Sequence, residues 1–157
     1  MEVTAINLEK TKEDVKSLAR EVGSYQLEKL DQKLNVSQKS TYLDLVSEVD
    51  KKAEEKIVNW IESNFPEHSI LAEESGTSDK ESKYKWVIDP LDGTTNYVHG
   101  FPIFSISIAL MENETPVLGV IYIPYLKEMY TAVNNKGAYL NGKPIKVNKK
   151  SELKESL

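Results

Sequence analysis

The stretch Trp86-Val87-Ile88-Asp89-Pro90-Leu91-Asp92-Gly93-Thr94-Thr95-Asn96 is the most informative part of this chain. A short apolar segment ends abruptly at Asp89, and Asp92 follows the intervening proline by two residues. Because the chain turns where the apolar segment ends, both carboxylates can converge on one point, with the carbonyl oxygen of Leu91 between them. Mg²⁺ prefers oxygen ligands in octahedral geometry. The stretch therefore predicts a metal site at Asp89, Leu91 and Asp92.

The residues that follow Asp92 favour an anion site. Gly93 lets the backbone approach a ligand closely, and 94–96 are typical of the first turn of a short helix. Free N–H groups at such a position bind anions, so we expect a phosphate at Gly93 and Thr94. The alternative is that Asp-Pro and Asp-Gly only form turns and that the threonine only caps a helix.

Two further acidic positions strengthen the prediction of a metal site. Glu73 follows a short apolar strand at 70–72, and Glu74 comes directly after it. Asp50 lies beside Val49, on the margin of the apolar stripe of a helix, so it can face the sheet. The alternatives are a solvated pair of glutamates and a surface salt-bridge partner.

Working outward, the first third of the chain has helical periodicity and the remainder has strand periodicity. One helix is predicted from Lys12 to Leu30, although Gly23 disfavours its middle. A second, capped by Asp44 or Ser47, extends through Ile61 and ends before Pro66. Short links should pair the following strands antiparallel, which gives an α+β domain with both helices on one sheet face. The predicted strands are Ser69–Ala72, Lys85–Asp89, Phe104–Met111, Val117–Ile123, Glu128–Val133, Ala138–Leu140 and Ile145–Val147.

The composition narrows the class of protein. A length of 157 residues suits a single domain over 1–157, and 39% hydrophobic with 29% charged residues is ordinary for a globular protein. The net charge of −5 gives no strong signal for nucleic-acid binding. The chain has no cysteine, no basic and apolar leader and no apolar run of about eighteen residues, so we expect a cytoplasmic protein without a membrane segment. We expect His68 and His99 to be structural or exposed.

The motifs resemble the two N-terminal signatures of the inositol monophosphatase family, at 72–75 and 86–96, and Asp44-Leu45-Val46 resembles the helix that leads to them. Members of this family are Mg²⁺-dependent, lithium-sensitive sugar-phosphate phosphatases related to fructose bisphosphatase, and the resemblance implies the same chemistry for this chain. It also implies the N-terminal half of an αβαβα fold. The expected activity is hydrolysis of a small phosphorylated substrate such as inositol 1-phosphate, another sugar phosphate or a phosphorylated nucleotide.

The resemblance assigns the metal ligands residue by residue. Glu73, Asp89 and the Leu91 carbonyl would hold a first Mg²⁺, for which Mn²⁺ is a possible substitute. Asp89 and Asp92 would share a second ion, and Glu73 would help to place a looser third. Two-metal sites place ions roughly 3.5–4 Å apart, which suits a bridging carboxylate such as Asp89.

The same resemblance assigns the groups that act on the substrate. The backbone of Gly93 and Thr94 would bind the phosphate. Thr94, oriented by Asp50, would position or deprotonate the attacking water, and Glu73 completes the catalytic set. Lys39 matches a lysine on a loop near the metals.

The sequence also departs from the family. Its members are typically much longer, and the Trp-Asp-x-Ala motif of their second half does not occur here. We therefore expect weak metal binding, little or no turnover by this chain alone, and self-association through apolar surface that has lost its cover. The full-length family implies a homodimer. Two other hypotheses stay open: an adaptor with the same fold that acts through protein contacts, and an inactive fragment.

Overall fold

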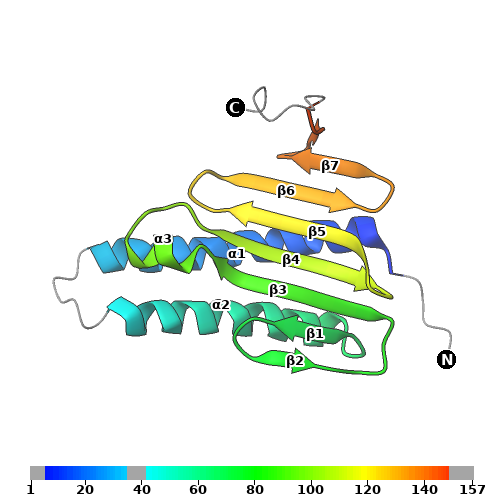
Figure 1. Cartoon of the computed structure of the whole chain (residues 1–157), viewed down its shortest axis with the longest axis horizontal. Helices are drawn as coiled ribbons and strands as arrows, with labels where there is room; N and C mark the ends of the chain where they lie inside the picture. Colours follow the sequence, from blue (N-terminus) through cyan, green and yellow to red (C-terminus); the bar gives the residue numbers. More distant parts are fainter. Residues whose placement is uncertain (1–5, 35–41, 149–157) are drawn as a thin grey trace.

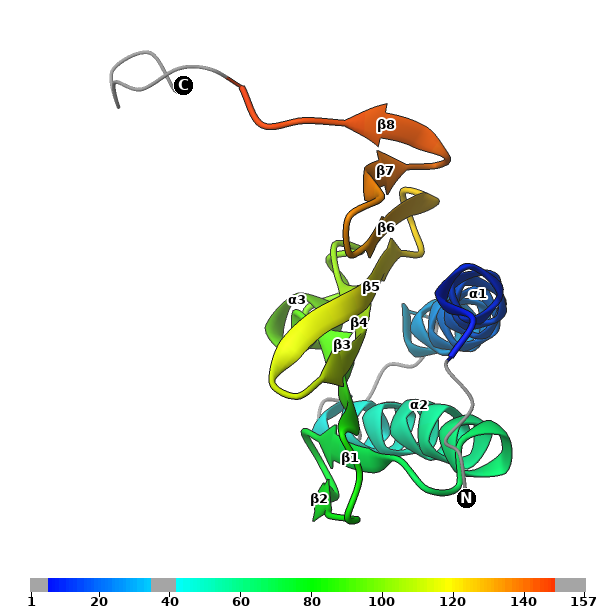
Figure 2. The ribbon, with the colours of Figure 1, turned by 90° about the vertical axis from the view of Figure 1, so that its right-hand side faces the viewer.

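Two long helices lie on one face of a single sheet. A computed structural model describes residues 6–34 and 42–148. The helices are α1 (Leu8–Leu34) and α2 (Tyr42–Asn64), and Figure 1 shows them running side by side behind the strands. In Figure 2, which views the sheet along its edge, both helices lie on the same side of it. The predicted α+β class with two N-terminal helices on one sheet face is confirmed.

The sheet contains eight strands in the described part of the chain, in the order β2-β1-β3-β4-β5-β6-β7-β8. A short helix, α3 (Thr94–Val98), connects β3 to β4. The strands are β1 (Ser69–Ala72), β2 (Gly76–Ser78), β3 (Tyr84–Asp92), β4 (Ser105–Glu112), β5 (Thr115–Ile123), β6 (Glu128–Val133), β7 (Gly137–Leu140) and β8 (Lys143–Ile145).

The expectation of antiparallel pairing is confirmed from β3 to β8 and wrong for β1 and β3, which are parallel. Parallel neighbours normally need a long crossover connection. Here β2 forms a hairpin with β1 and returns the chain to the edge at which β1 began. From there residues 79–83 lead into β3, so a three-residue strand replaces a crossover helix.

Two strands near the sheet edges differ from the prediction. β2 was not predicted, because its residues Gly-Thr-Ser are all exposed and carry no apolar alternation. The last strand lies at Lys143–Ile145 and not at Ile145–Val147. Asn141 and Gly142 both have positive φ angles, of 49° and 79°, which forms a tight turn and pairs Lys143 with Leu140 directly. The alternate spacing of the apolar residues Ile145 and Val147, on which the prediction rested, therefore does not mark a strand.

The core lies between the helices and the sheet. Its members alternate along each strand or recur at helical spacing, as the sequence pattern predicts. Trp86 at the centre of β3 is fully buried and packs against Trp60 of α2 with ring centroids 6.1 Å apart. The other large contributors are Val15, Val22, Ile57, Ile61, Ile106, Ile108, Leu110 and Leu118. None of the helices in the described ranges is long and apolar enough to span a lipid bilayer.

Candidate active site

The carboxyl ends of β1 and β3 lie side by side. The parallel register pairs Ala72, the last residue of β1, with Ile88 of β3. Glu73 and Asp89, which follow these two residues, interact through their carboxyl groups. The crevice beyond the carboxyl ends of adjacent parallel strands is a recurrent ligand site in α/β sheets. The structure therefore brings together two of the predicted ligands that are sixteen positions apart in the sequence.

A β-bulge places Asp89 and Asp92 on the same face of the sheet. In a regular strand, residues three apart point to opposite faces. Here Asp89 pairs with Ser107 and Asp92 pairs with Ser105, so the two residues between them oppose the single residue Ile106. Ser105 and Ser107 share a face, and hence Asp89 and Asp92 do as well. The Ser105 hydroxyl donates a hydrogen bond of 3.2 Å to Asp92 Oδ2.

Asp50 reaches this carboxylate cluster from α2. Its side chain is only 8% exposed, as its position beside Val49 predicted, and Oδ1 has no hydrogen-bond partner among the described residues. Burial, and then the negative charges of Glu74, Glu73 and Asp89, raise the pKa of Asp50 to about 7. The cluster therefore holds more negative charge than its surroundings neutralise.

Asp89 shows the same excess of negative charge. Burial, then repulsion from Glu73 and Asp92, and a hydrogen bond between the Asp89 and Glu73 carboxyl groups raise the pKa of Asp89 to about 6. The Leu91 N–H, which donates to Asp89 Oδ1 at 3.1 Å, opposes this rise. Carboxylates that repel one another in this way favour a bound cation or proton.

The segment after Asp92 turns sharply into α3. Gly93 has a φ of 92° and stands at the N-cap without a side-chain cap. A Cβ at this position would lie 3.2 Å from the carbonyl oxygen of Ile103 and 3.3 Å from Phe104 Cα. The Thr94 hydroxyl donates to the Leu91 carbonyl at 3.0 Å, so this carbonyl is occupied by a protein donor in the structure. The predicted helical turn after Gly93 is confirmed.

Three buried side chains that the sequence analysis did not single out support the cluster from behind. Glu54, one turn after Asp50 on α2, accepts hydrogen bonds from the backbone N–H groups of Glu74 and Ser75, each at 2.8 Å. The side-chain amide of Gln26 in α1 donates to the Pro90 carbonyl at 2.7 Å, and the Tyr97 hydroxyl donates to the backbone carbonyl of Gln26 at 2.7 Å. The i, i+4 spacing of Asp50 and Glu54 was the available signal, because it places both on one helix face.

The residues of the predicted site separate into those that converge and those outside the described ranges. Asp50, Glu73, Asp89 and Asp92 converge, with Gly93 and Thr94 next to them. Lys39 lies outside the described residues. In the part of the chain that the structure describes, no three acidic or histidine side chains are spaced to hold a metal ion.

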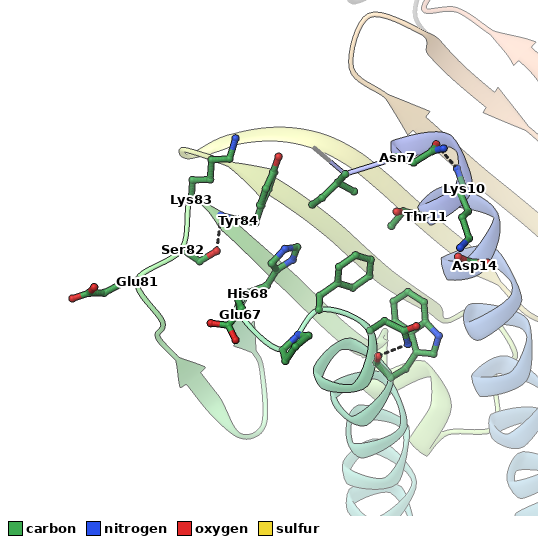
Figure 3. A pocket seen from close by; sticks show the side chains of 15 residues that line it. Asn7, Lys10, Thr11, Asp14, Glu67, His68, Glu81, Ser82, Lys83 and Tyr84 are labelled. Carbon is green, nitrogen blue, oxygen red and sulfur yellow. Dashed lines mark hydrogen bonds between the residues drawn. The ribbon is translucent and has the colours of Figure 1, made fainter. Parts of the chain in front are cut away.

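A pocket at the opposite ends of β1 and β3 contains none of these residues. It has a volume of about 830 Å³, and Figure 3 shows His68 and Tyr84 on one side of it, facing Thr11 and Lys10 of α1. His68 is buried, and its Nδ1 accepts a hydrogen bond from Trp86 Nε1 at 3.1 Å, whereas His99 is exposed. The expectation that neither histidine belongs to the site agrees with these positions.

Comparison with known proteins gives concordant results. The model of the inositol monophosphatase family matches residues 7–157. Inositol monophosphatase 1 of Solanum lycopersicum is 48% identical over 119 residues, which are 73% of this chain and 44% of the relative. Fructose-1,6-bisphosphatase/inositol-1-monophosphatase of Aquifex aeolicus is 47% identical over 113 residues, 72% of this chain and 43% of the relative.

A solved structure supports the fold. The inositol monophosphatase from Anabaena (Nostoc) sp. PCC 7120 superimposes with a TM-score of 0.80 at 38% identity, and the match covers 94% of this chain and 53% of that one. The chain spans about half the length of the relatives it matches.

Proposed function

Because this chain belongs to the inositol monophosphatase family, we propose that it carries the metal and phosphate site of a phosphomonoesterase acting on a small sugar or inositol phosphate. The observation that carries the proposal is the meeting of Glu73, Asp89 and Asp92 at the carboxyl ends of two parallel strands. Acidic residues from separate segments converge there on one cluster, and a glycine with positive φ follows immediately.

The donor set fits divalent magnesium. It consists of carboxylate and carbonyl oxygens, and hard cations such as Mg²⁺ prefer those ligands. The excess negative charge that raises the pKa of Asp50 and Asp89, and the unpartnered Oδ1 of Asp50, are what a cation would relieve. In the proposal Glu73, Asp89 and the Leu91 carbonyl hold one Mg²⁺, and Asp89 and Asp92 hold a second; Mn²⁺ is a possible substitute.

The remaining residues bind and orient the reactants. The backbone of Gly93 and Thr94 receives the phosphate. Because Gly93 has no Cβ, the chain can turn tightly beside Phe104 and leave these backbone N–H groups at the start of α3. Thr94 orients the attacking water, and its hydroxyl accepts the water's proton as it passes its own proton to the Asp50 carboxylate. Magnesium, when bound, neutralises the charge of the phosphate and activates water for attack.

For the chain as it stands, we propose weak metal binding and little turnover. No three acidic side chains of the described residues are spaced to hold a metal ion, and the chain covers only 43–44% of the length of the matched relatives. Selectivity among phosphate esters is then a property of the longer relatives and not of this half alone.

The test is calorimetric titration of the chain with Mg²⁺ and Mn²⁺. We expect Asp92→Asn to weaken binding by about tenfold or more, because it removes a charged ligand at an exposed position that the core does not need. Asp79→Asn is the matched control, since Asp79 is exposed and directly follows β2, at the end of β1 opposite to Glu73.

Phosphate release from inositol 1-phosphate, measured with the same proteins, tests the reaction. In the calorimetric titration, equal Mg²⁺ affinities of the unmodified chain and its Asp92→Asn variant would contradict the metal site. Saturable, rapid turnover by the unmodified chain would contradict the proposed impairment while supporting the phosphatase activity.

A further inference from the structure

Glu54 is a buried carboxylate whose two oxygens both bind the backbone of the β1–β2 turn. Its side chain is 4% exposed. Oε2 accepts the N–H of Glu74 and Oε1 accepts the N–H of Ser75, both at 2.8 Å. These are short, charge-assisted hydrogen bonds, which are about twice as strong as neutral ones.

The backbone N–H groups of the turn take the place of a cationic partner for Glu54. No lysine, arginine or histidine of the described residues forms an ion pair with it. A buried charge is costly unless it is paired or hydrogen-bonded. The two backbone donors therefore supply the hydrogen bonds that offset the burial of the Glu54 carboxyl group.

The turn has little other support. Residues 73–78 are exposed, β2 is only three residues long, and Gly76 adopts a positive φ of 80°. Glu73 immediately precedes the two bonded N–H groups, and its charge is repelled by Asp89 and Asp50. Without an attachment, this repulsion would move the turn away from the end of β3.

We infer that Glu54 is a positioning residue that fixes the backbone after β1, so that the Glu73 carboxylate stays beside Asp89. Asp50 and Glu54 lie one turn apart on α2, so a single turn of this helix supplies one member of the cluster and anchors another. The consequence for catalysis rests on the proposed function; the anchoring itself does not.

The first measurement needs no variant. Amide hydrogen exchange of the chain, followed by NMR, should show protected N–H groups at Glu74 and Ser75, in the exposed turn between β1 and β2. Unprotected amides at Glu74 and Ser75 would overturn the inference, because the hydrogen bonds would then not persist in solution.

The second measurement compares Glu54→Gln with Glu55→Gln. Glutamine keeps the size of the side chain but removes the charge and replaces one acceptor by a donor. Glu55 is the adjacent, exposed glutamate of the same helix, so it controls for the loss of a negative charge on α2. We expect Glu54→Gln to accelerate exchange at Glu74 and Ser75 by about tenfold or more, with the core amides of β3 and β4 unchanged.

Titration with Mn²⁺ completes the test. Glu54→Gln should raise the dissociation constant by about 10–100-fold, the usual effect of removing a group that orients a ligand, and Glu55→Gln should leave it unchanged. Faster exchange with an unchanged Mn²⁺ affinity would overturn the link between Glu54 and Glu73.

Failure of the proposed function has a different signature. If the unmodified chain binds no Mn²⁺ while Glu74 and Ser75 are protected and respond to Glu54→Gln, the metal site is wrong and the anchoring stands. If Glu54→Gln unfolds the chain, the exchange pattern of the unmodified protein alone decides the inference.

Discussion

At the scale of single residues, the candidate site is electrostatically unfavourable for the metal-free protein. Asp50 and Asp89 are the described carboxyl groups whose pKa values are raised furthest, to about 7 and about 6, chiefly by burial and then by neighbouring carboxylates. Such shifts cluster at functional sites, where charge is arranged for a ligand and not for stability. The stability of the chain should therefore increase when this charge is removed.

Replacement of Asp50 by asparagine should stabilise the metal-free chain at pH 8. The folded-state pKa of Asp50, about 7, exceeds the ordinary value of 3.8, so the folded state binds more protons between these values and the free energy of unfolding falls as pH rises through 7. Urea denaturation in chelator should give Asp50→Asn an advantage of about 1–3 kcal/mol at pH 8, shrinking towards zero near pH 4.

Asp79→Asn is the control and should show no such pH-dependent advantage. An Asp50→Asn protein that is no more stable than the unmodified chain at pH 8 would show that the buried carboxylate is neutralised by other means.

His68 should make stability depend on pH in the opposite sense. Burial, and then the charge of Lys80, lower the pKa of His68 below 6.5, so the unfolded chain binds more protons as pH falls below that value. The contribution of His68 to the free energy of unfolding is complete above pH 6.5 and is lost as the pH falls below that value. The unfolding free energy should decline more steeply between pH 7 and 5 in the unmodified chain than in His68→Gln.

The exposed His99 supplies the matched comparison through His99→Gln. Parallel pH profiles for the unmodified chain and His68→Gln would contradict the role of burial, since the glutamine cannot titrate.

At the scale of elements, two glycines decide how segments approach one another. Gly93 has a φ of 92° and allows β3 to turn into α3 beside Phe104. Gly23, in the middle of α1, lies where that helix crosses the sheet: a Cβ there would be 2.8 Å from Pro124 Cγ and from Tyr122 Cε1. Gly23 therefore lowers the intrinsic helix propensity of α1 but lets the helix pack closely against Tyr122 and Pro124.

Gly93→Ala should destabilise the chain by about 1–3 kcal/mol, because alanine disfavours positive φ and its methyl group would press on the Ile103 carbonyl. Thermal unfolding followed by circular dichroism measures the loss. Gly119→Ala in β5 is the control: nothing lies within 4 Å of its Cβ position and its φ is ordinary, so we expect little change. Equal melting temperatures for the two variants would contradict the strain at Gly93.

Gly23→Ala should lower the stability of the chain although alanine favours helices by about 1 kcal/mol over glycine. Overpacking against the rigid ring of Pro124 costs about 1–3 kcal/mol and outweighs that gain. Chemical denaturation should show a net loss of about 1 kcal/mol. At the neighbouring exposed position Ser24→Ala should be neutral or slightly stabilising, and a stabilised Gly23→Ala protein would show that α1 does not pack this closely.

At the scale of the whole molecule, the two long helices of the described residues both cover the same face of the sheet. Figure 2 shows α1 and α2 on one side. The strand registers align an apolar row across the other face, with small residues at its centre, and Ile121 beside it is 43% exposed. The row contains Leu71, Val87, Ala109, Gly119, Ala132, Ala138 and Ile145.

Two copies of the chain should associate through this face. Sedimentation velocity should show a concentration-dependent rise in mass, and Ile121→Lys should suppress it, because a charge on the apolar face opposes burial. Asn59→Lys, on the exposed surface of α2, adds the same charge elsewhere and should leave association unchanged. A monomer at high concentration would contradict the expectation.

The sequence alone predicted most of the elements and the residue types of the candidate site. Helical and strand periodicities predicted α1, α2 and most of the sheet, because apolar residues recur wherever a side chain faces the core. The order of Asp89, Pro90, Asp92 and Gly93 predicted a turn rich in oxygen ligands, because those residue types act locally.

The tertiary structure decided which of these residues meet. The hairpin through β2 makes β1 and β3 parallel, and only then do Glu73 and Asp89 lie at the same edge; antiparallel strands would separate them by the length of the strand. The bulge that turns Asp89 and Asp92 to one face, and the reach of Glu54 and Gln26 from the helices, arise from pairing and packing between distant segments. Local periodicity carries no record of such pairing, because the free energy that selects it belongs to contacts formed only in the folded chain.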